Sequence, residues 1–461
     1  MFSFSFFVIS INARVLLIRQ GIFLPTKKPN HRFSDNYGGL IMSSSIHDTE
    51  YSFSSNQTII GAQMLFVAFG ALVLVPLLTG LDPNVALFTA GLGTLIFQLV
   101  TRGQVPVFLA SSFAFIAPII YGTQTWGVPA TMGGLVCAGG LYMLISVAIK
   151  AFGVGWLQRA FPAVVVGPVI MVIGLSLAPV AVSMATGLAG ETQIVPKNIS
   201  LIIAAITLLA TILIAIRGRG MMRIVPIFCG IIIGYIASLI IGGITGTSLV
   251  NVDAITNAAW FAVPSFTFPE FQWAAIIFIV PVAIAPAIEH FGDIMAISGV
   301  TKKNYMENPG IHRTMMGDGL ATSAAGMLGG PPNTTYSEVT GVVTLTKVFN
   351  PGVMTWAAIF AILLAFVGKL GGVLVSIPMP VMGGVMVLLF GLITTVGISV
   401  LIKDQIDVSN PRNMSIMAII LVVGVGGLIV PVGGGMTLAG IGLAGILGVI
   451  LNLILPEHQD N

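Results

Sequence analysis

The chain has 461 residues, of which 56% are hydrophobic and 8% are charged, and its formal net charge is +3. Soluble domains carry about 25% charged residues, so this composition excludes a soluble fold and predicts an all-α polytopic protein of the lipid bilayer. The two cysteines, Cys137 and Cys229, lie inside apolar stretches, which argues against a disulfide framework or a zinc site. No cofactor, metal or nucleic-acid partner is expected.

The first 41 residues differ in composition from the rest. Their opening, MFSFSFFVIS, has no basic residue before its apolar run, and no small-residue cleavage site follows. This argues against a signal peptide. Residues 1–41 are therefore expected to be a non-native extension or a disordered tail. In this interpretation translation begins at Met42, and residues 42–56 form a cytoplasmic N-terminus.

Apolar runs separated by turn residues predict about fourteen membrane segments. Two of them, beginning near Pro106 and Asn333, are too short to span as ordinary helices. The segments lie near 57–79, 84–101, 106–121, 129–149, 162–187, 199–216, 222–242, 273–298, 312–328, 334–346, 352–368, 374–401, 413–431 and 436–455.

Basic residues fall on alternate connections between these segments, and the opposite connections hold only Lys197 and Lys369. Because Lys and Arg concentrate on cytoplasmic loops, both termini are predicted to lie inside a cell whose inner membrane holds the chain. The predicted cytoplasmic set is Arg102, Lys150, Arg159, Arg217, Arg219, Arg223, Lys302, Lys303, Arg313, Lys347, Lys403 and Arg412.

Weak internal echoes predict two halves of seven segments each. Phe69-Gly70 recurs as Phe291-Gly292, Gly174-Leu175 recurs as Gly391-Leu392, and PVFLASSF (106–113) aligns with PPNTTYSE (331–338). The offsets are similar, at 222, 217 and 225 residues. Because seven is odd, the second half must be inverted in the membrane.

The stretch GGPPNTTYSEVTG (329–341) puts prolines, hydroxyls and a carboxylate between long apolar segments. Pro331 and Pro332 exclude helix, so an extended strand is predicted before a helix that starts near Ser337. A matching strand is expected after Pro106. Two such strands can satisfy each other's backbone and aim two half-helices at one point of the membrane midplane. The alternative is a pair of re-entrant loops without a ligand.

Four acidic residues lie within apolar segments without a Lys or Arg at similar depth: Glu289, Asp293, Asp318 and Glu338. A charge at the bilayer centre costs about 2.5–3.5 kcal/mol even on the lenient insertion scale, so all four are functional candidates. Glu289 and Asp293 share a helix face, where two carboxylates tend to hold a proton between them. Glu338 lies where a half-helix begins, and a helix N-terminus favours negative charge.

Structural roles are the alternatives for several of these residues. Asp318 also fits a helix cap or a backbone hydrogen-bond partner, and Asp293 also fits a role in orienting a neighbour. His290 points away from Glu289 on the helix and is expected to pack. Phe113 fits the core as well, but it occupies the position that mirrors Glu338.

An acidic pocket that holds an aromatic side chain and no cation suits a neutral, planar, hydrogen-bonding solute. Carboxylates accept hydrogen bonds from ring N–H groups, the aromatic face stacks, and backbone N–H groups at half-helix tips meet carbonyls. An anion carrier would instead need Arg or Lys near the half-helices.

These motifs resemble the nucleobase–ascorbate transporter family, and within it the bacterial uracil permeases. FGALVLVPLL, SSFAFIAP, IEHFGD, GIHRTMMGDGLAT, PPNTTYSE and PVMGG occur in the family's order between about residues 57 and 455. The family signature is matched at Glu338, Gly341, Thr346 and Lys347, whereas Val339 stands where Asn is usual.

The resemblance implies a core domain, at 57–150 and 273–370, and a gate domain, at 151–245 and 371–455. Residues 456–461 are then a cytoplasmic tail. It also implies proton-coupled import, and several members of the family act as homodimers.

The resemblance also assigns roles to single positions. Glu289 and Glu338 would hydrogen-bond the base, Phe113 would stack on it, and the backbone at Ala71 and Ser337 would complete the contacts. Phe390 falls where uracil permeases tend to show a Tyr on the gate domain.

Three positions bear on the substrate. Asp293 stands where uracil members have His and purine members have Asp. Asp318 stands where uracil members commonly have Asn and purine members again have Asp. Glu338 follows the uracil type, because purine members usually have Gln. Uracil is favoured, with xanthine as the alternative.

The expected activity is secondary active transport. A proton binds the Glu289–Asp293 pair, with Asp318 as a further coupling candidate, and the loaded core moves against the gate. No cluster resembles a sodium cage, so protons are the expected coupling ion. The rivals are an anion transporter on the same fold and, from two Gly-Asp pairs, an intramembrane aspartyl protease, whose Gly-x-Gly-Asp and Tyr-Asp motifs are absent.

Overall fold

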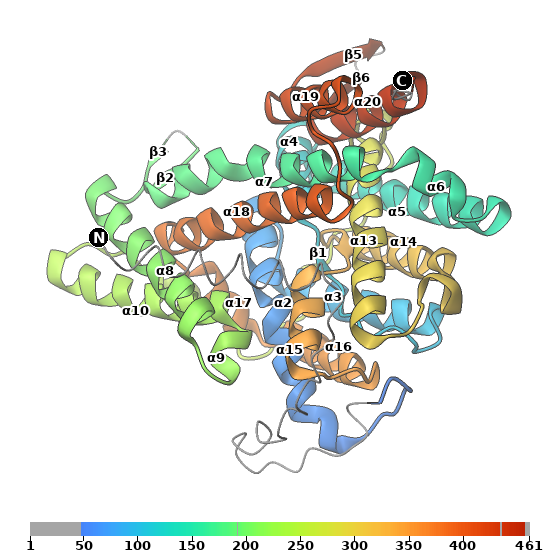
Figure 1. The fold of residues 1–461 in the computed structure, drawn as a ribbon. Helices are drawn as coiled ribbons and strands as arrows, with labels where there is room; N and C mark the ends of the chain where they lie inside the picture. The colour runs from blue at the N-terminus through green and yellow to red at the C-terminus, as the bar shows by residue number, and fades with distance from the viewer. Residues whose placement is uncertain (1–47, 191, 434–435, 457–461) are drawn as a thin grey trace, which may run out of the picture. The chain divides into compact units, whose positions relative to one another are not determined.

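The computed structural model describes residues 48–190, 192–433 and 436–456 (Figure 1). The predicted extension, 1–41, lies outside the described residues, as do the first residues of the predicted cytoplasmic N-terminus and nearly all of the predicted tail. Within the described ranges, eight helices are long and apolar enough to cross a membrane: Ser55–Thr79, Pro83–Val100, Gly127–Phe152, Ala163–Ala185, Lys197–Arg217, Pro226–Thr245, Trp273–Thr301 and Met379–Lys403.

The helices follow the predicted segments closely. Up to residue 245 they are α2 (Thr58–Thr79), α3 (Pro83–Val100), α4 (Ile116–Thr125), α5 (Gly127–Phe152), α6 (Gly155–Ala160), α7 (Ala163–Ala185), α8 (Lys197–Arg217), α9 (Met221–Ile224) and α10 (Pro226–Thr245). After it come α11 (Val252–Thr256), α12 (Trp273–Ile279), α13 (Ile284–Thr301), α14 (Ile311–Met327), α15 (Ser337–Thr346), α16 (Gly352–Ala365), α17 (Gly368–Val375), α18 (Met379–Lys403), α19 (Pro411–Val425) and α20 (Gly440–Ile454).

Outward-facing helices carry large apolar side chains. On α8, Leu209 is 58% exposed and Ile216 is 72% exposed; on α10, Ile244 is 80% exposed. A contiguous apolar surface of this kind is costly in water, and it is the surface that lipid tails cover. The chain is a multi-pass membrane protein, as its composition predicts.

The long helices pack in two sets. One set contains α2, α3, α5, α14 and α16, and the other contains α7, α8, α10, α18 and α19 (Figure 1). Small residues permit the closest contacts, as is usual between membrane helices. A Cβ added to Gly167 of α7 would lie 2.9 Å from the Gly397 carbonyl oxygen of α18.

The two short segments contain the predicted strands, and these strands pair. β1 (Ala110–Ser111) is antiparallel to β4 (Asn333–Thr334), with Ala110 opposite Thr334 and Ser111 opposite Asn333. The Ser112 N–H donates to the Pro332 carbonyl oxygen at 2.8 Å.

Threonines on neighbouring helices bond backbone groups in and beside the two strands. Thr94 of α3 accepts from the Leu109 N–H at 2.9 Å, and Thr322 of α14 donates to the Asn333 carbonyl oxygen at 2.7 Å. Non-helical backbone is tolerated at membrane depth only when it is satisfied in this way. α15 begins at Ser337, as predicted.

Several predicted helical segments are broken in the structure. The segment 273–298 is interrupted by a 3-10 turn at Val280–Ala283, where Pro281 lacks the N–H that an α-helix needs. The segment 352–368 ends at Ala365, and α17 follows as a separate helix.

Strands also occur where the sequence was interpreted as part of two spanning segments. The end of the predicted segment 413–431 and the start of the predicted segment 436–455 form strands instead of helix. These strands, β5 (Ile429–Gly433) and β6 (Met436–Ala439), pair as an antiparallel hairpin. Gly426 and Gly427 follow the end of α19 at Val425, and Gly427 takes a positive φ that ends the helix. The chain is therefore mostly helical rather than all-α.

Candidate substrate-binding site

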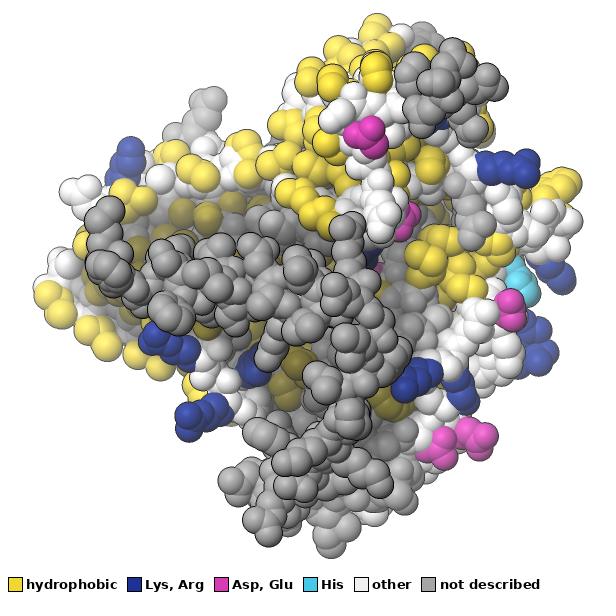
Figure 2. Space-filling view, in the orientation of Figure 1, with side chains coloured by type: hydrophobic (Ala, Val, Ile, Leu, Met, Phe, Trp, Pro, Cys, Tyr) yellow, Lys and Arg dark blue, Asp and Glu magenta, His cyan; other side chains and the backbone are white. Residues whose placement is uncertain are grey.

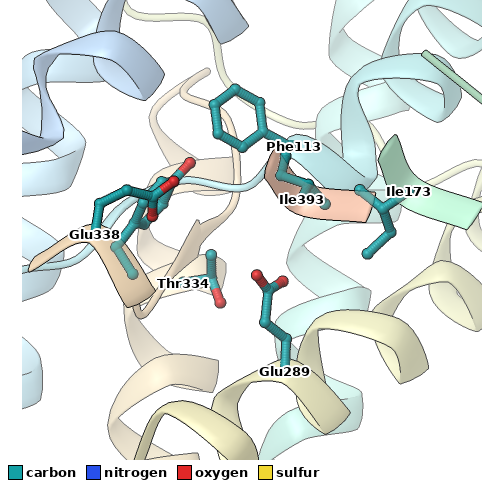
Figure 3. Close-up of a pocket in the computed structure, with 7 residues that line it drawn as sticks. Phe113, Ile173, Glu289, Thr334, Glu338 and Ile393 are labelled. Carbon is teal, nitrogen blue, oxygen red and sulfur yellow. The ribbon is translucent and has the colours of Figure 1, made fainter. Parts of the chain in front are cut away.

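A pocket of about 290 Å³ lies where the paired strands give way to the two short helices (Figure 3). Its lining residues are Phe113, Ile173, Glu289, Thr334, Tyr336, Glu338 and Ile393.

Two carboxylates reach the pocket from different helices. Glu289 of α13 is half-buried, and Figure 3 shows its carboxylate directed into the cavity. Glu338 lies in the first turn of α15, where the helix dipole favours negative charge, and its side chain is accessible from the pocket. Among the described residues, no Lys or Arg lines this pocket. The site therefore offers hydrogen-bond acceptors without a compensating cation.

Strand alternation decides which side chains of the 333–336 stretch face the pocket. Thr334 and Tyr336 line it, whereas Asn333 and Thr335 point elsewhere. The Asn333 side-chain amide donates to the Thr89 carbonyl oxygen at 2.9 Å, and the Thr335 hydroxyl donates to Asp293 Oδ2 at 2.9 Å. Alternate side chains of this polar stretch therefore line the pocket, while the others form hydrogen bonds to the helices that support it.

Tyr336 connects the two broken segments. Its hydroxyl donates to the Ser111 carbonyl oxygen at 2.5 Å, and its ring meets the Phe113 ring edge-on, with 5.8 Å between centroids. Phe113 begins the 3-10 turn that leads into α4. Its ring is thereby held over the pocket, where a planar ligand can stack on it.

Asp293 lies one turn beyond Glu289 on α13, as predicted, but it does not line the pocket. Its side chain is 4% exposed and accepts the hydrogen bond from Thr335. Asp293 therefore links α13 to the chain just after β4, and it is a neighbour of the site rather than part of its wall.

Asp318 and His290 form a buried pair behind the pocket. His290 Nδ1 is 3.3 Å from Asp318 Oδ2, and both side chains are fully buried. His290 Nε2 also lies 3.0 Å from the Thr314 hydroxyl. The full burial of His290 agrees with the packing role expected of it, and its ring nitrogens also lie near the polar groups of Asp318 and Thr314. Asp318 sits in the middle of α14 and does not cap it.

The other predicted contact residues surround the pocket at different distances. Phe390 of α18 is buried behind Phe113, with an edge-on ring contact of 6.2 Å, and it is not a lining residue. Ser337 stands between two lining residues at the start of α15. Ala71, buried in α2, does not line the pocket through its side chain.

Two lining residues carry no signal in the sequence. Ile173 of α7 and Ile393 of α18 close the pocket on the side opposite Glu338 (Figure 3). Isoleucine is common in this chain, so its presence alone indicates no site. The only hint is that Ile393 lies one helical turn after Phe390, which was a predicted contact residue. Within the described residues, no group of three or more His, Cys, Asp or Glu side chains is arranged to hold a metal ion.

Comparison with known proteins identifies relatives along most of the chain. Residues 55–433 match the model of the Permease family that covers xanthine and uracil permeases. A "probable uracil permease" of Pasteurella multocida (strain Pm70) is 54% identical over 406 residues, covering 88% of this chain and 95% of that protein. The "uracil permease" of Bacillus subtilis (strain 168) is 45% identical, covering 86% of this chain and 92% of that protein.

A solved structure shares the fold at much lower identity. The murine Solute Carrier 26 family member A9 anion transporter, solved in an inward-facing state, aligns with a TM-score of 0.61 and 12% identity. The alignment covers 95% of this chain and 74% of that one. At this identity the likeness shows the fold alone.

Proposed function

The chain belongs to the Permease family of xanthine and uracil permeases, and from this premise we propose that it imports uracil across the inner membrane by proton symport. As a permease it is a transporter rather than an enzyme. The observation that carries the proposal is a pocket in which Glu289 and Glu338 lie beside an aromatic ring and, among the described residues, no Lys or Arg is present.

The chemistry of uracil complements this pocket. Uracil is neutral and planar, with two ring N–H donors and two carbonyl acceptors. Glu289 and Glu338 would accept from the N–H groups, while Phe113 would stack on the ring. The backbone N–H at Ser337, where α15 begins, would meet a carbonyl, and the backbone at Ala71 would complete the contacts as the resemblance implies.

Uracil is favoured over xanthine by the names of the relatives and by the position of Asp293. An aspartate held by Thr335 outside the pocket wall is a weaker determinant of substrate than the lining Glu338. Xanthine remains the second candidate, on the basis of the aspartates at 293 and 318. Transport of an anion is disfavoured, because a carboxylate-lined pocket repels negative charge.

The proposed alternating access is supported by the division of the lining residues between two domains. Phe113, Glu289 and Glu338 belong to the proposed core (57–150 and 273–370). The apolar wall of Ile173 and Ile393 belongs to the proposed gate (151–245 and 371–455). The proposed inverted repeats are supported by two pairings of matching parts, β1 with β4 and α7 with α18.

For the coupling step we propose Glu289 as the proton-binding residue, with Asp293 and Asp318 in supporting roles. Both termini would be cytoplasmic, with the Arg- and Lys-bearing connections on the same side. The homodimer implied by the resemblance stays a prediction.

Uptake of radiolabelled uracil tests the proposal in cells that lack their own nucleobase permeases. Saturable uptake that a protonophore stops and excess xanthine leaves unchanged is the expected result. Strong competition by xanthine, or entry of labelled xanthine without uracil, would assign the substrate to the purine class. Competition by sulfate or bicarbonate would favour anion transport instead.

A further inference from the structure

A second pocket lies apart from the substrate site and has the opposite charge. It measures about 470 Å³ and is lined by Arg102, Asn308, Pro309, His312 and Arg313. None of these residues contributes to the proposed transport chemistry. The pocket is therefore a separate feature of the molecule.

The two guanidinium groups have no acidic partner. Among the described residues, no carboxylate lies within salt-bridge distance of Arg102 or Arg313, and neither side chain makes a hydrogen bond to another described group. Glu307 is exposed nearby in the chain but does not line the pocket. Lys150, in the last turn of α5, adds positive charge close to His312. A half-open pocket lined by two arginines without an acidic partner favours an anion.

The pocket lies at the ends of membrane helices. Arg102 follows the end of α3 by two residues, and Arg313 is the third residue of α14, whose N-terminal dipole is also positive. Figure 2 shows several Lys and Arg side chains, and one acidic side chain, near a histidine at the edge where α5 and α14 lie in Figure 1. Helix ends with basic residues are found at the depth of lipid headgroups.

We propose that this pocket binds a phosphate group, carried either by the headgroup of an anionic phospholipid or by free phosphate. Guanidinium groups bind phosphate oxygens through paired N–H donors, and the Asn308 amide offers a further donor. Basic pockets between membrane helices are known to hold anionic lipid headgroups. A phosphate held by both arginines joins the end of α3 to the start of α14. The proposal does not depend on the identity of the transported solute.

Thermal unfolding of the full purified chain in neutral detergent tests this site without a transport assay. After delipidation, the unfolding temperature is measured as dioleoyl-phosphatidylglycerol is added, with dioleoyl-phosphatidylcholine as the control lipid. A second titration uses inorganic phosphate, with chloride at equal ionic strength as the control. The variants are Arg102→Gln and Arg313→Gln, with Arg102→Lys to retain charge if the first fails to fold. Arg219→Gln, on an exposed connection outside the pocket, is the matched control.

The expected result is stabilisation by phosphatidylglycerol at concentrations where phosphatidylcholine has little effect. Half-saturation should need roughly fivefold more phosphatidylglycerol in each Gln variant, since one basic residue near an anionic headgroup contributes about that factor, and should be unchanged in Arg219→Gln. The same pattern with inorganic phosphate would identify free phosphate as the ligand. Equal responses of the wild type and both pocket variants, or no preference for either phosphate probe, would overturn the proposal.

Discussion

Glu289→Gln separates the two roles that the substrate pocket gives to this side chain. Gln keeps the size of the side chain and an accepting oxygen, but it does not titrate. When Glu289 carries the proton, its carboxyl is neutral and Gln reproduces its accepting oxygen, so binding should change little. If uracil binds before the proton, the charged acceptor is lost; a hydrogen bond to a charged group exceeds a neutral one by about 1 kcal/mol, so binding weakens at most roughly fivefold. Binding should therefore survive the substitution.

Accumulation of uracil should not survive it. If one proton enters with each uracil, a pH difference of one unit supplies about 1.36 kcal/mol, which supports roughly tenfold accumulation. Without a proton-binding group at this position, the ratio of internal to external uracil falls to about one.

The assay is steady-state uptake of labelled uracil by proteoliposomes under an imposed pH gradient, with binding measured on the same preparations. Glu270→Gln makes the same change at an exposed glutamate in the connection before α12 and should behave as the wild type. Tenfold accumulation by Glu289→Gln would refute the assignment of the proton to this residue. Loss of binding by more than about a hundredfold would make Glu289 chiefly a binding residue.

Three further substitutions test the pocket and its frame. Phe113→Ala removes the stacking ring and should weaken uracil binding by roughly tenfold, whereas Phe113→Leu should recover part of the loss in an equilibrium binding assay. Tyr336→Phe keeps the ring but removes the hydrogen bond to Ser111, which should lower the free energy of unfolding by about 1–3 kcal/mol; an unchanged denaturation midpoint would contradict the bridging role. Gly397→Ala places a Cβ against the α7 backbone and should lower the unfolding temperature, while Gly391→Ala, with open space around it, should not.

Much of the fold is predictable because lipid imposes strong constraints on sequence. A bilayer requires long apolar helices, and prolines and polar residues mark the places where helices cannot continue. The strand at 333–334 and the helix start at Ser337 were therefore accessible from Pro331, Pro332 and the residues that follow. The hairpin at 429–439 was not, because its β-branched and glycine residues are equally typical of membrane helices.

The residues of the candidate site also fall into those that the sequence indicates and those that it does not. Carboxylates are rare within the apolar segments of this chain, so Glu289 and Glu338 stand out, and both line the pocket. The period-two alternation of a strand also places Thr334 and Tyr336 beside them. Ile173 and Ile393 have no such signal, because their role depends on which helices face each other. The partner that Asp318 finds in His290, on another helix, is likewise set by tertiary packing.

The distribution of polar groups around the pocket bears directly on how the proposed carrier would move. Glu289, Thr334, Tyr336 and Glu338 all come from the segment that runs from α13 to α15, so the hydrogen bonds to the solute would stay with one set of elements. The α7–α18 side supplies isoleucine, whose contacts are weak individually and have no preferred direction. Breaking a directional hydrogen bond in a low-dielectric site is costly, whereas exchanging one apolar contact for another costs little. In the proposed mechanism, a solute bound in this way would travel with its polar partners past an apolar wall, and the barrier to movement would be low.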